Sequence, residues 1–315
     1  MRLLLHACCG PCSLEPSRIL REQGHDIAIF YANSNIAPAG EYARRLSTLR
    51  QWAEPEGIAV EAGAYDQGAW QRSAGRIGEA AVEEAKRRIL TDGPADGAPA
   101  KGGEGGAPAC EDAGRASGRE GDDGPSPFEP GSPTPLRRFG KHGELTLDEA
   151  AALAVDPEKR AARCRACYRL RLEEAARRAA QMGFEALGTT LAVSPYQYTE
   201  IIREELERAA GQAGVQAVFE DFRPFYPEAT RKSRELGMYR QNYCGCALSN
   251  VEAAAERAER KAERRARREA ERAAHVEEHA AEEAQRAARK AERAAYDAKQ
   301  ARKRAILKAL RERAM

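Results

Sequence analysis

The hydrophobic pattern at the start of the chain consists of two short apolar runs with a stretch of helical spacing between them. Residues 2–7 (RLLLHA) and 25–33 (HDIAIFYAN) predict strands. Residues 13–24 predict a helix that ends at Gly24, since glycine is favoured just after a helix. A strand, a helix and a strand in this order form a β-α-β unit with parallel strands and a right-handed crossover. The pattern therefore predicts an open parallel α/β sheet.

The second half of the chain shows the same alternation of helical spacing and apolar runs. It predicts a helix, a strand, a helix, a strand and closing helical turns over residues 156–183, 184–196, 199–214, 215–222 and 228–249. We expect residues 1–72 and 156–250 to form one catalytic α/β domain.

Residues 73–155 interrupt this domain and read as an insertion. Residues 92–135 are rich in Gly, Pro, Ala and Asp and predict disorder, because they cannot bury enough apolar surface to offset the entropy of ordering. The flanks at 78–90 and 144–155 have helical spacing and predict short ordered helices.

Composition indicates the cellular compartment of the protein and the kind of chemistry that its cysteines support. The chain has 315 residues and a net charge of +2, so no global charge demands a polyanionic partner. It has no apolar run of signal-peptide or membrane-span length, so we expect a cytoplasmic protein that does not cross a membrane. Eight cysteines in a reducing compartment favour metal or redox chemistry over structural disulfides.

Seven of the eight cysteines fall into three clusters, and the eighth, Cys110, lies alone in the insertion. The clusters are Cys8/Cys9/Cys12, Cys164/Cys167 and Cys244/Cys246. Each lies where a predicted strand ends or a predicted helix turns. The carboxyl ends of parallel strands meet at one edge of the sheet, so we expect these thiols in one pocket.

Three kinds of site use such thiols. A [4Fe–4S] cluster takes four and leaves three for a second metal or a redox pair. Zinc also takes four, and Cys164-x-x-Cys167 suits it, but adjacent cysteines such as Cys8 and Cys9 are unusual in zinc sites. A thioredoxin-like dithiol at Cys9-Gly-Pro-Cys12 explains only two of the seven. The iron–sulfur interpretation is favoured.

Polar and aromatic side chains near the same edge predict substrate contacts, although turn chemistry or a solvated helix face explains each segment alone. These candidates are Tyr31, Asn33, Asn35, Glu41, Tyr42, Arg45, Thr189, Thr190, Ser194, Tyr239, Arg240 and Gln241. The chain has neither a phosphate-binding G-x-x-x-x-G-K-[ST] loop nor a Gly-rich dinucleotide fingerprint after a strand. We therefore expect electrons to come from a separate donor protein.

Four motifs in this order carry a family resemblance: LLLHACCGPCS, RCRACYRLRL, GTTLAVSPY and MYRQNYCGCALS. With NIAPAGEYARR and DFR they make the chain, over residues 1–72 and 156–250, similar to the iron–sulfur, cobalamin-independent epoxyqueuosine reductases. The resemblance implies a nucleotide-hydrolase-like (HUP) sheet, a [4Fe–4S] cluster and a second iron. It also implies action on the epoxide of epoxyqueuosine in the tRNA anticodon loop, to give queuosine. The insertion and the tail depart from the family pattern.

Removing an epoxide oxygen to leave an alkene takes two electrons and two protons. A [4Fe–4S] cluster passes one electron at a time, and a second iron with an open position can act as a Lewis acid. This explains a need for seven thiols. We expect Cys9, Cys164, Cys167 and Cys246 to hold the cluster. We assign Cys8, Cys12 and Cys244 to the second iron as the catalytic set.

Two alternatives come from other classes. An ATP-dependent tRNA-sulfur-transfer enzyme of similar fold would need a Ser-Gly-Gly-x-Asp-Ser type loop, which CCGPCS replaces. A zinc-bearing RNA-binding module would be colourless, whereas an iron–sulfur protein is brown.

Residues 251–315 form a tail of Ala, Glu, Arg and Lys with 19 Lys+Arg and 13 Asp+Glu, a net of +6. Large apolar residues are too few for a heptad seam. The pattern predicts a single solvated helix held by i,i+4 ion pairs. A tRNA-contacting arm at its basic end, KQARKRAILKALRER, is the alternative.

Overall fold

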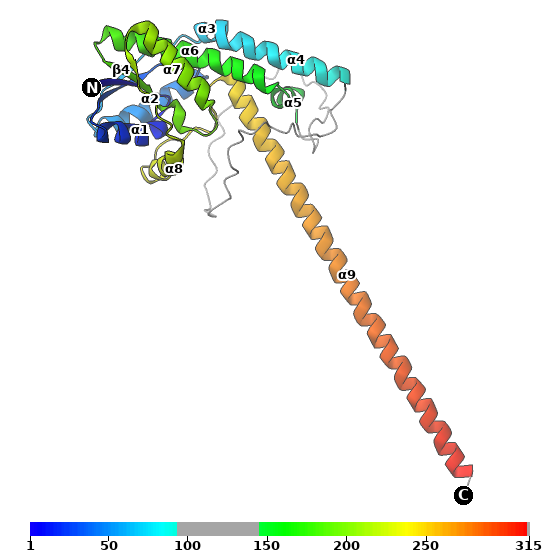
Figure 1. The fold of residues 1–315 in the computed structure, drawn as a ribbon. Coiled ribbons are helices and arrows are strands. Elements are labelled where there is room, and N and C mark those ends of the chain that lie inside the picture. The colour runs from blue at the N-terminus through cyan, green and yellow to red at the C-terminus, as the bar shows by residue number, and fades with distance from the viewer. Residues whose placement is uncertain (93–144, 314–315) are drawn as a thin grey trace. The chain divides into compact units, whose positions relative to one another are not determined.

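The computed structural model describes residues 1–92 and 145–313. Its centre is a five-stranded sheet in the order β3-β2-β1-β4-β5, with every pair parallel (Figure 1). The strands are β1 (Arg2–His6), β2 (Asp26–Tyr31), β3 (Val60–Ala62), β4 (Ala186–Thr189) and β5 (Gln216–Ala217). The predicted open parallel sheet is confirmed.

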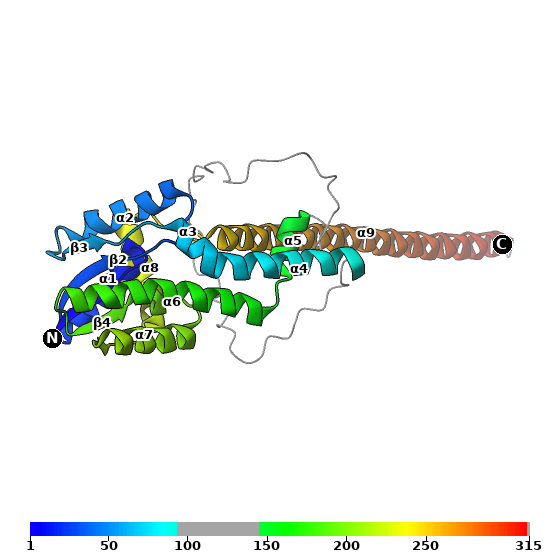
Figure 2. The ribbon, with the colours of Figure 1, turned by 90° about the horizontal axis from the view of Figure 1, so that it is seen from above.

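Helices cover both faces of the sheet, because alternate residues of each strand point to opposite sides. Leu3 and Leu5 of β1 pack with α1 (Gly10–Glu22), α2 (Ala39–Ala53) and α8 (Tyr226–Glu235). Leu4 packs on the other face with α6 (Pro157–Gln181) and α7 (Thr199–Ala213). Figure 1 shows α6 and α7 on one side of the sheet and α1 and α8 on the other, and Figure 2 shows the molecule from the side of α6 and α7. The sheet is therefore doubly wound.

The remaining elements are short, apart from the helices α4 and α9. These remaining elements are α3 (Gln67–Trp70), the π-helical turn η1 (Gln71–Gly75), α4 (Arg76–Asp92), α5 (Leu147–Leu153), the 3-10 turns η2 (Thr190–Val193) and η3 (Arg223–Phe225), and α9 (Ala247–Arg313). Both flanks of the insertion are thus helical, and α4 packs against α5. The predicted disorder of residues 92–135 lies outside the described residues, except for Asp92 at the end of α4.

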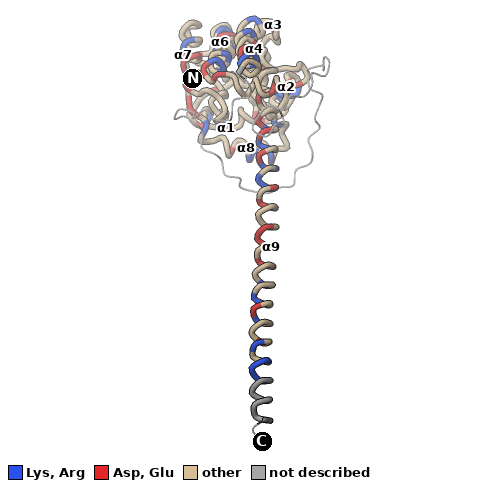
Figure 3. Tube along the Cα trace, turned by 90° about the vertical axis from the view of Figure 1, so that its right-hand side faces the viewer, with Lys and Arg blue, Asp and Glu red and all other residues tan. Residues whose placement is uncertain are grey.

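The chain forms two compact units, Met1–Ala258 and Glu259–Met315. The first turns of α9 belong to the first unit: Ala255 is fully buried beside Leu145, and Glu252 pairs with Arg163 of α6 at 2.6 Å. The second unit is helical through Arg313, and Figure 3 shows acidic and basic residues interspersed along α9. No helix among the described residues is long and apolar enough to cross a membrane.

Candidate metal and substrate site

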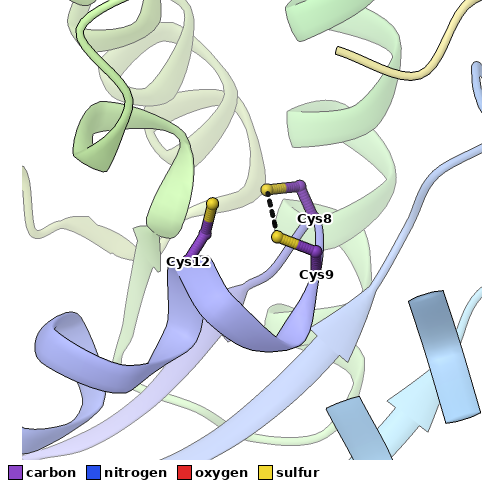
Figure 4. Close-up of side chains that lie close together, drawn as sticks. All are labelled: Cys8, Cys9 and Cys12. Carbon is purple, nitrogen blue, oxygen red and sulfur yellow. Dashed lines mark hydrogen bonds between the residues drawn. The ribbon is translucent and has the colours of Figure 1, made fainter. Parts of the chain in front are cut away.

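The first cysteine cluster forms a compact group of three thiols at the end of β1. Cys8 and Cys9 follow the strand, and Cys9 is the N-cap of α1, whose first turn carries Cys12. The three Sγ atoms lie within 4.8 Å of one another, with 3.8 Å between those of Cys8 and Cys9. Figure 4 shows the three sulfur atoms on the same side of the turn. This spacing allows all three thiols to bind one metal ion.

The electrostatics of this group favour one thiolate and two thiols. Hydrogen bonds from Cys12 and Cys9 hold the pKa of Cys8 well below its usual value. The same bond to Cys8 raises the pKa of Cys12, and burial raises that of Cys9 to about 12. A bound cation would deprotonate the remaining two, because thiolates are the metal ligands.

The other four thiols come from α6 and from the turn before α9. Cys167 and Cys246 are buried together against Trp70. Burial raises the pKa of Cys164 to about 12, and the charges of Cys167 and Cys246 also raise it. Burial, Cys246, Cys167 and Cys164 raise the pKa of Cys244. The four thiols are thus within electrostatic reach of one another and form a second group, which we call the α6–α9 thiols.

Two buried arginines, which the sequence reasoning missed, supply positive charge to the thiols. Arg163 is 4% exposed, pairs with Glu252 and donates to Cys164 Sγ at 3.7 Å. Arg171 is 2% exposed, and although burial lowers its pKa, the charges of Cys167, Cys8 and Cys244 raise it. The signal was present in RCRACYRLRL, because Arg171 follows Cys167 by four residues, one helical turn.

The Cys244–Gly245–Cys246 turn is held by residues that the sequence predicted as substrate contacts. Arg45, only 1% exposed, donates to Cys244 O at 2.9 Å and to Glu41 Oε1 at 2.6 Å. Gly245 has φ +142°, and its carbonyl accepts from Ala37 N at 2.9 Å. Arg45, which is oriented by Glu41, therefore holds the turn at the Cys244 carbonyl, and Ala37 holds it at Gly245.

Several other predicted contacts are also engaged within the protein. Tyr31 OH donates to Tyr42 O at 3.2 Å, and Tyr239 OH donates to Glu41 Oε2 at 2.7 Å. Asn33 donates to Ala7 O at 2.8 Å, and its Oδ1 accepts from Arg171. Their role toward a substrate remains a prediction, but they all support the edge that carries the thiols.

The junction between β1 and β4 joins the strand ends to the first thiol group. His6 Nδ1 lies 3.0 Å from Thr189 Oγ1, and its Nε2 lies 3.1 Å from Ala32 O, so the ring bridges both neighbouring strands. Thr190 Oγ1 accepts from Cys8 N at 3.4 Å. The strand order changes direction between β1 and β4. Ligands of open α/β sheets bind at the carboxyl edge near such a change.

Two predicted contacts keep unused hydrogen-bonding atoms at the site. Asn35 is 2% exposed, and neither its Oδ1 nor its Nδ2 has a partner among the described residues. Gln241 donates from Nε2 to Cys9 Sγ at 2.8 Å, while its buried Oε1 has no partner in the same part of the chain. These atoms can meet polar groups of a bound molecule.

Gln197 is a further residue that the sequence reasoning did not single out. Its Oε1 accepts from Tyr168 OH at 2.7 Å and lies 3.8 Å from Cys244 Sγ. It follows Ser194 in the loop after η2, and Ser194 Oγ accepts from Tyr196 N at 3.3 Å. Arg240, on a different segment, donates to Thr230 Oγ1 at 3.5 Å.

Comparison with known proteins identifies a family for the chain. The model of the family "Epoxyqueuosine reductase QueH" matches residues 3–89 and 144–252. A protein of that name from Dehalococcoides mccartyi is 22% identical over 80% of this chain and 93% of its own length. The Staphylococcus aureus protein is 25% identical over 80% and 76%, and that of Thermotoga maritima 39% identical over 30% and 51%. The chain therefore belongs to the epoxyqueuosine reductase QueH family of oxidoreductases.

Proposed function

We propose that this chain reduces epoxyqueuosine to queuosine in tRNA at a site built from its seven clustered thiols. The reaction consumes the epoxide, two electrons and two protons, and it yields the alkene and water. The observation that carries the proposal is the group of Cys8, Cys9 and Cys12, whose Sγ atoms lie within 4.8 Å of one another. The buried Arg171 links this group to the other segments, because, although burial lowers its pKa, the charges of Cys167, Cys8 and Cys244 all raise it. The names of the family and of its relatives supply the substrate.

The thiols fit an iron–sulfur cluster with a second iron beside it. Cys164, Cys167, Cys244 and Cys246 provide the four ligands that a [4Fe–4S] cluster needs. Cys8, Cys9 and Cys12 suit a single iron with one open position. This division differs from the one predicted from the sequence, because Cys9 now binds the second iron and Cys244 now binds the cluster. It is supported by the tight grouping of the first three sulfurs and by the mutual electrostatics of the α6–α9 thiols.

When bound, the cluster would supply single electrons and the second iron a Lewis acid. The protein's own residues prepare the site for them. Arg163 and Arg171 offset the negative charge of the thiolates in a buried setting, where uncompensated charge is costly. Asn35 and Gln241 offer free polar atoms that could orient the ring that carries the epoxide.

We also infer the source of the electrons and the compartment of the reaction. The loop after β1 carries thiols where a nucleotide-binding chain would carry a phosphate cradle, so we infer an external electron-donor protein. Because the substrate is tRNA, we place the reaction in the cytoplasm.

The test is turnover on an anticodon stem-loop RNA that carries epoxyqueuosine. Anaerobically prepared protein and a chemical reductant should lower the mass of the RNA by one oxygen atom, as measured by mass spectrometry. Omission of the reductant should leave the mass unchanged. If iron-loaded, reduced protein binds the RNA but leaves its mass unchanged, the proposed reaction is wrong.

A further inference from the structure

A tyrosine beside the thiol site is exposed in an otherwise ordered loop. Tyr196 is 76% exposed, although its neighbours in the chain are tied down. Ser194 O accepts from Gln197 N at 3.2 Å, and Tyr198 N donates to Tyr168 OH at 3.5 Å. The backbone is therefore fixed on both sides of a large aromatic ring that lies mostly in solvent.

A second tyrosine supports the first from another element. The ring of Tyr226, the first residue of α8, meets that of Tyr196 edge-on, with centroids 6.3 Å apart and an interplanar angle of 85°. Tyr226 packs against the core that α1 and α8 share, so it is anchored to the scaffold. Such an edge contact fixes an aromatic ring without burying it.

The tyrosine pair borders the thiol site. Gln197, the residue after Tyr196, reaches to within 3.8 Å of Cys244 Sγ. Burial raises the pKa of Tyr226, and Tyr196 and the Cys12 thiol raise it further, so the phenol and that thiol are close enough to interact. The loop therefore presents Gln197 to the thiols and Tyr196 to solvent.

Positive charge lies next to the pair. Arg240 donates to Thr230, one turn along α8 from Tyr226, and it has no carboxylate partner among the described residues. An exposed aromatic ring beside an unpaired cation is the combination that binds single-stranded nucleic acid, with the ring under a base and the cation at a phosphate.

We propose that Tyr196, supported by Tyr226, is a stacking platform for an unpaired anticodon-loop base next to the modified nucleoside, with Arg240 at the adjoining phosphate. This inference rests on the proposed function, because the proposed function supplies the RNA that the platform would bind. It adds a contact outside the reacting centre, and that contact fixes the register of the loop over the thiols.

Binding of an anticodon stem-loop RNA to the full-length protein, followed by fluorescence anisotropy, tests the platform. Tyr196→Ala should weaken binding about tenfold, since stacking of one base contributes roughly 5- to 150-fold to affinity. Tyr196→Phe keeps the ring and should bind within about twofold of the unmodified protein. Tyr296→Ala, which removes a 61% exposed tyrosine from α9, is the matched control and should have no effect.

Abasic substitutions along the RNA loop locate the stacked base. At one position the abasic RNA should bind Tyr196→Ala no more weakly than it binds the unmodified protein, because the stack is already lost. Unchanged affinity of Tyr196→Ala, an equal loss in Tyr296→Ala, or full additivity at every loop position would each overturn the platform.

Turnover with a chemical reductant separates this outcome from the fate of the proposed function. If the unmodified protein removes the oxygen and Tyr196→Ala binds RNA equally well, only the platform fails. If the unmodified protein binds the stem-loop through Tyr196 but never removes the oxygen, the reaction is wrong and the platform stands. A Tyr196→Ala defect that appears only with a protein donor, and not in RNA binding, would assign the ring to donor docking and overturn the platform.

Discussion

At the scale of single residues, the division of the seven thiols rests on Cys9 and Cys244. In the division we propose, Cys244→Ser removes a cluster ligand and should lower bound sulfide well below the roughly four per chain of a [4Fe–4S] protein. Cys9→Ser should retain that sulfide and lose about one iron. Iron and sulfide analysis of both variants, prepared without oxygen, is the measurement. The reverse result, with sulfide lost from Cys9→Ser and retained by Cys244→Ser, would restore the division expected from spacing.

Gly245 is required by geometry rather than by chemistry. A Cβ on Gly245 would lie 2.9 Å from Asn35 Nδ2 and from Ile36 Cγ1, and φ +142° is unfavourable for any other residue. We expect Gly245→Ala to shift the turn between two ligands and to lower cofactor content severalfold. Gly237→Ala is the control, because φ is also positive there but nothing lies within 4 Å. Equal iron and sulfide in the two variants would contradict this role for the turn.

At the scale of elements, the sequence predicted most of the helices, and the first thiol group follows β1 as expected. The β-α-β start and the helix over 156–183 have strong periodicity and appear as β1, α1, β2 and α6. The strand predicted over 215–222 is only Gln216–Ala217, because this edge of the sheet pairs on one side alone. The three-residue β3 gives too short a pattern to detect.

The site was predictable as far as side-chain chemistry and strand ends determine it. Cysteine spacing was enough to bring Cys8, Cys9 and Cys12 to one edge. It could not show that Arg45 holds a cysteine turn, because that contact joins residues 199 positions apart. Long-range contacts of this kind depend on how α2 packs and leave no local pattern.

The packing of α7 on α6 depends on a buried carboxylate. Glu205, whose side chain is 2% exposed, accepts from Arg169 at 2.8 Å and from Arg208 at 2.8 Å. Burial raises the pKa of Glu205, but the bonds from these two arginines lower it more, and the net pKa is about 2. A carboxyl pKa below its value of 4.5 in the unfolded chain stabilises the fold above pH 4.5, and this contribution is lost as the pH falls toward 2.

We therefore expect Glu205→Gln to lower the free energy of unfolding by about 1–3 kcal/mol at neutral pH, allowing for the exposure of the arginines. The gap between variant and unmodified protein should narrow as the pH falls below 4.5. Urea unfolding at a series of pH values measures it. Glu204→Gln, at a side chain 54% exposed, is the control and should change stability by less than about 0.5 kcal/mol. A gap that does not vary with pH would show that the ion pairs do not stabilise the packing.

At the scale of the whole molecule, the second unit, Glu259–Met315, carries none of the candidate ligands. Its exposed ion pairs, such as Arg265–Glu269 at 3.0 Å and Arg267–Glu271 at 3.6 Å, are of the i,i+4 kind expected for a solvated helix. Truncation should follow Ala258 rather than Ser249, because removal of Glu252 would leave the buried Arg163 without its carboxylate.

We expect the chain truncated after Ala258 to keep its cofactor and its turnover of bound RNA, since every candidate ligand precedes that residue. The salt dependence of RNA binding should also be unchanged, because acidic and basic residues are interspersed and partly cancel. Binding constants at several salt concentrations, for the full and truncated chains, are the measurement. A clearly shallower slope in the truncated chain would show that the basic end contacts tRNA.

Both the proposed reaction and the proposed division of the cysteines depend on what the seven thiols hold. Iron, zinc and acid-labile sulfide should be measured in full-length protein purified without oxygen. We expect a brown protein with about four sulfide and about five iron atoms per chain and little zinc. A colourless protein with stoichiometric zinc and no sulfide, although purified from iron-replete cells, would contradict this expectation.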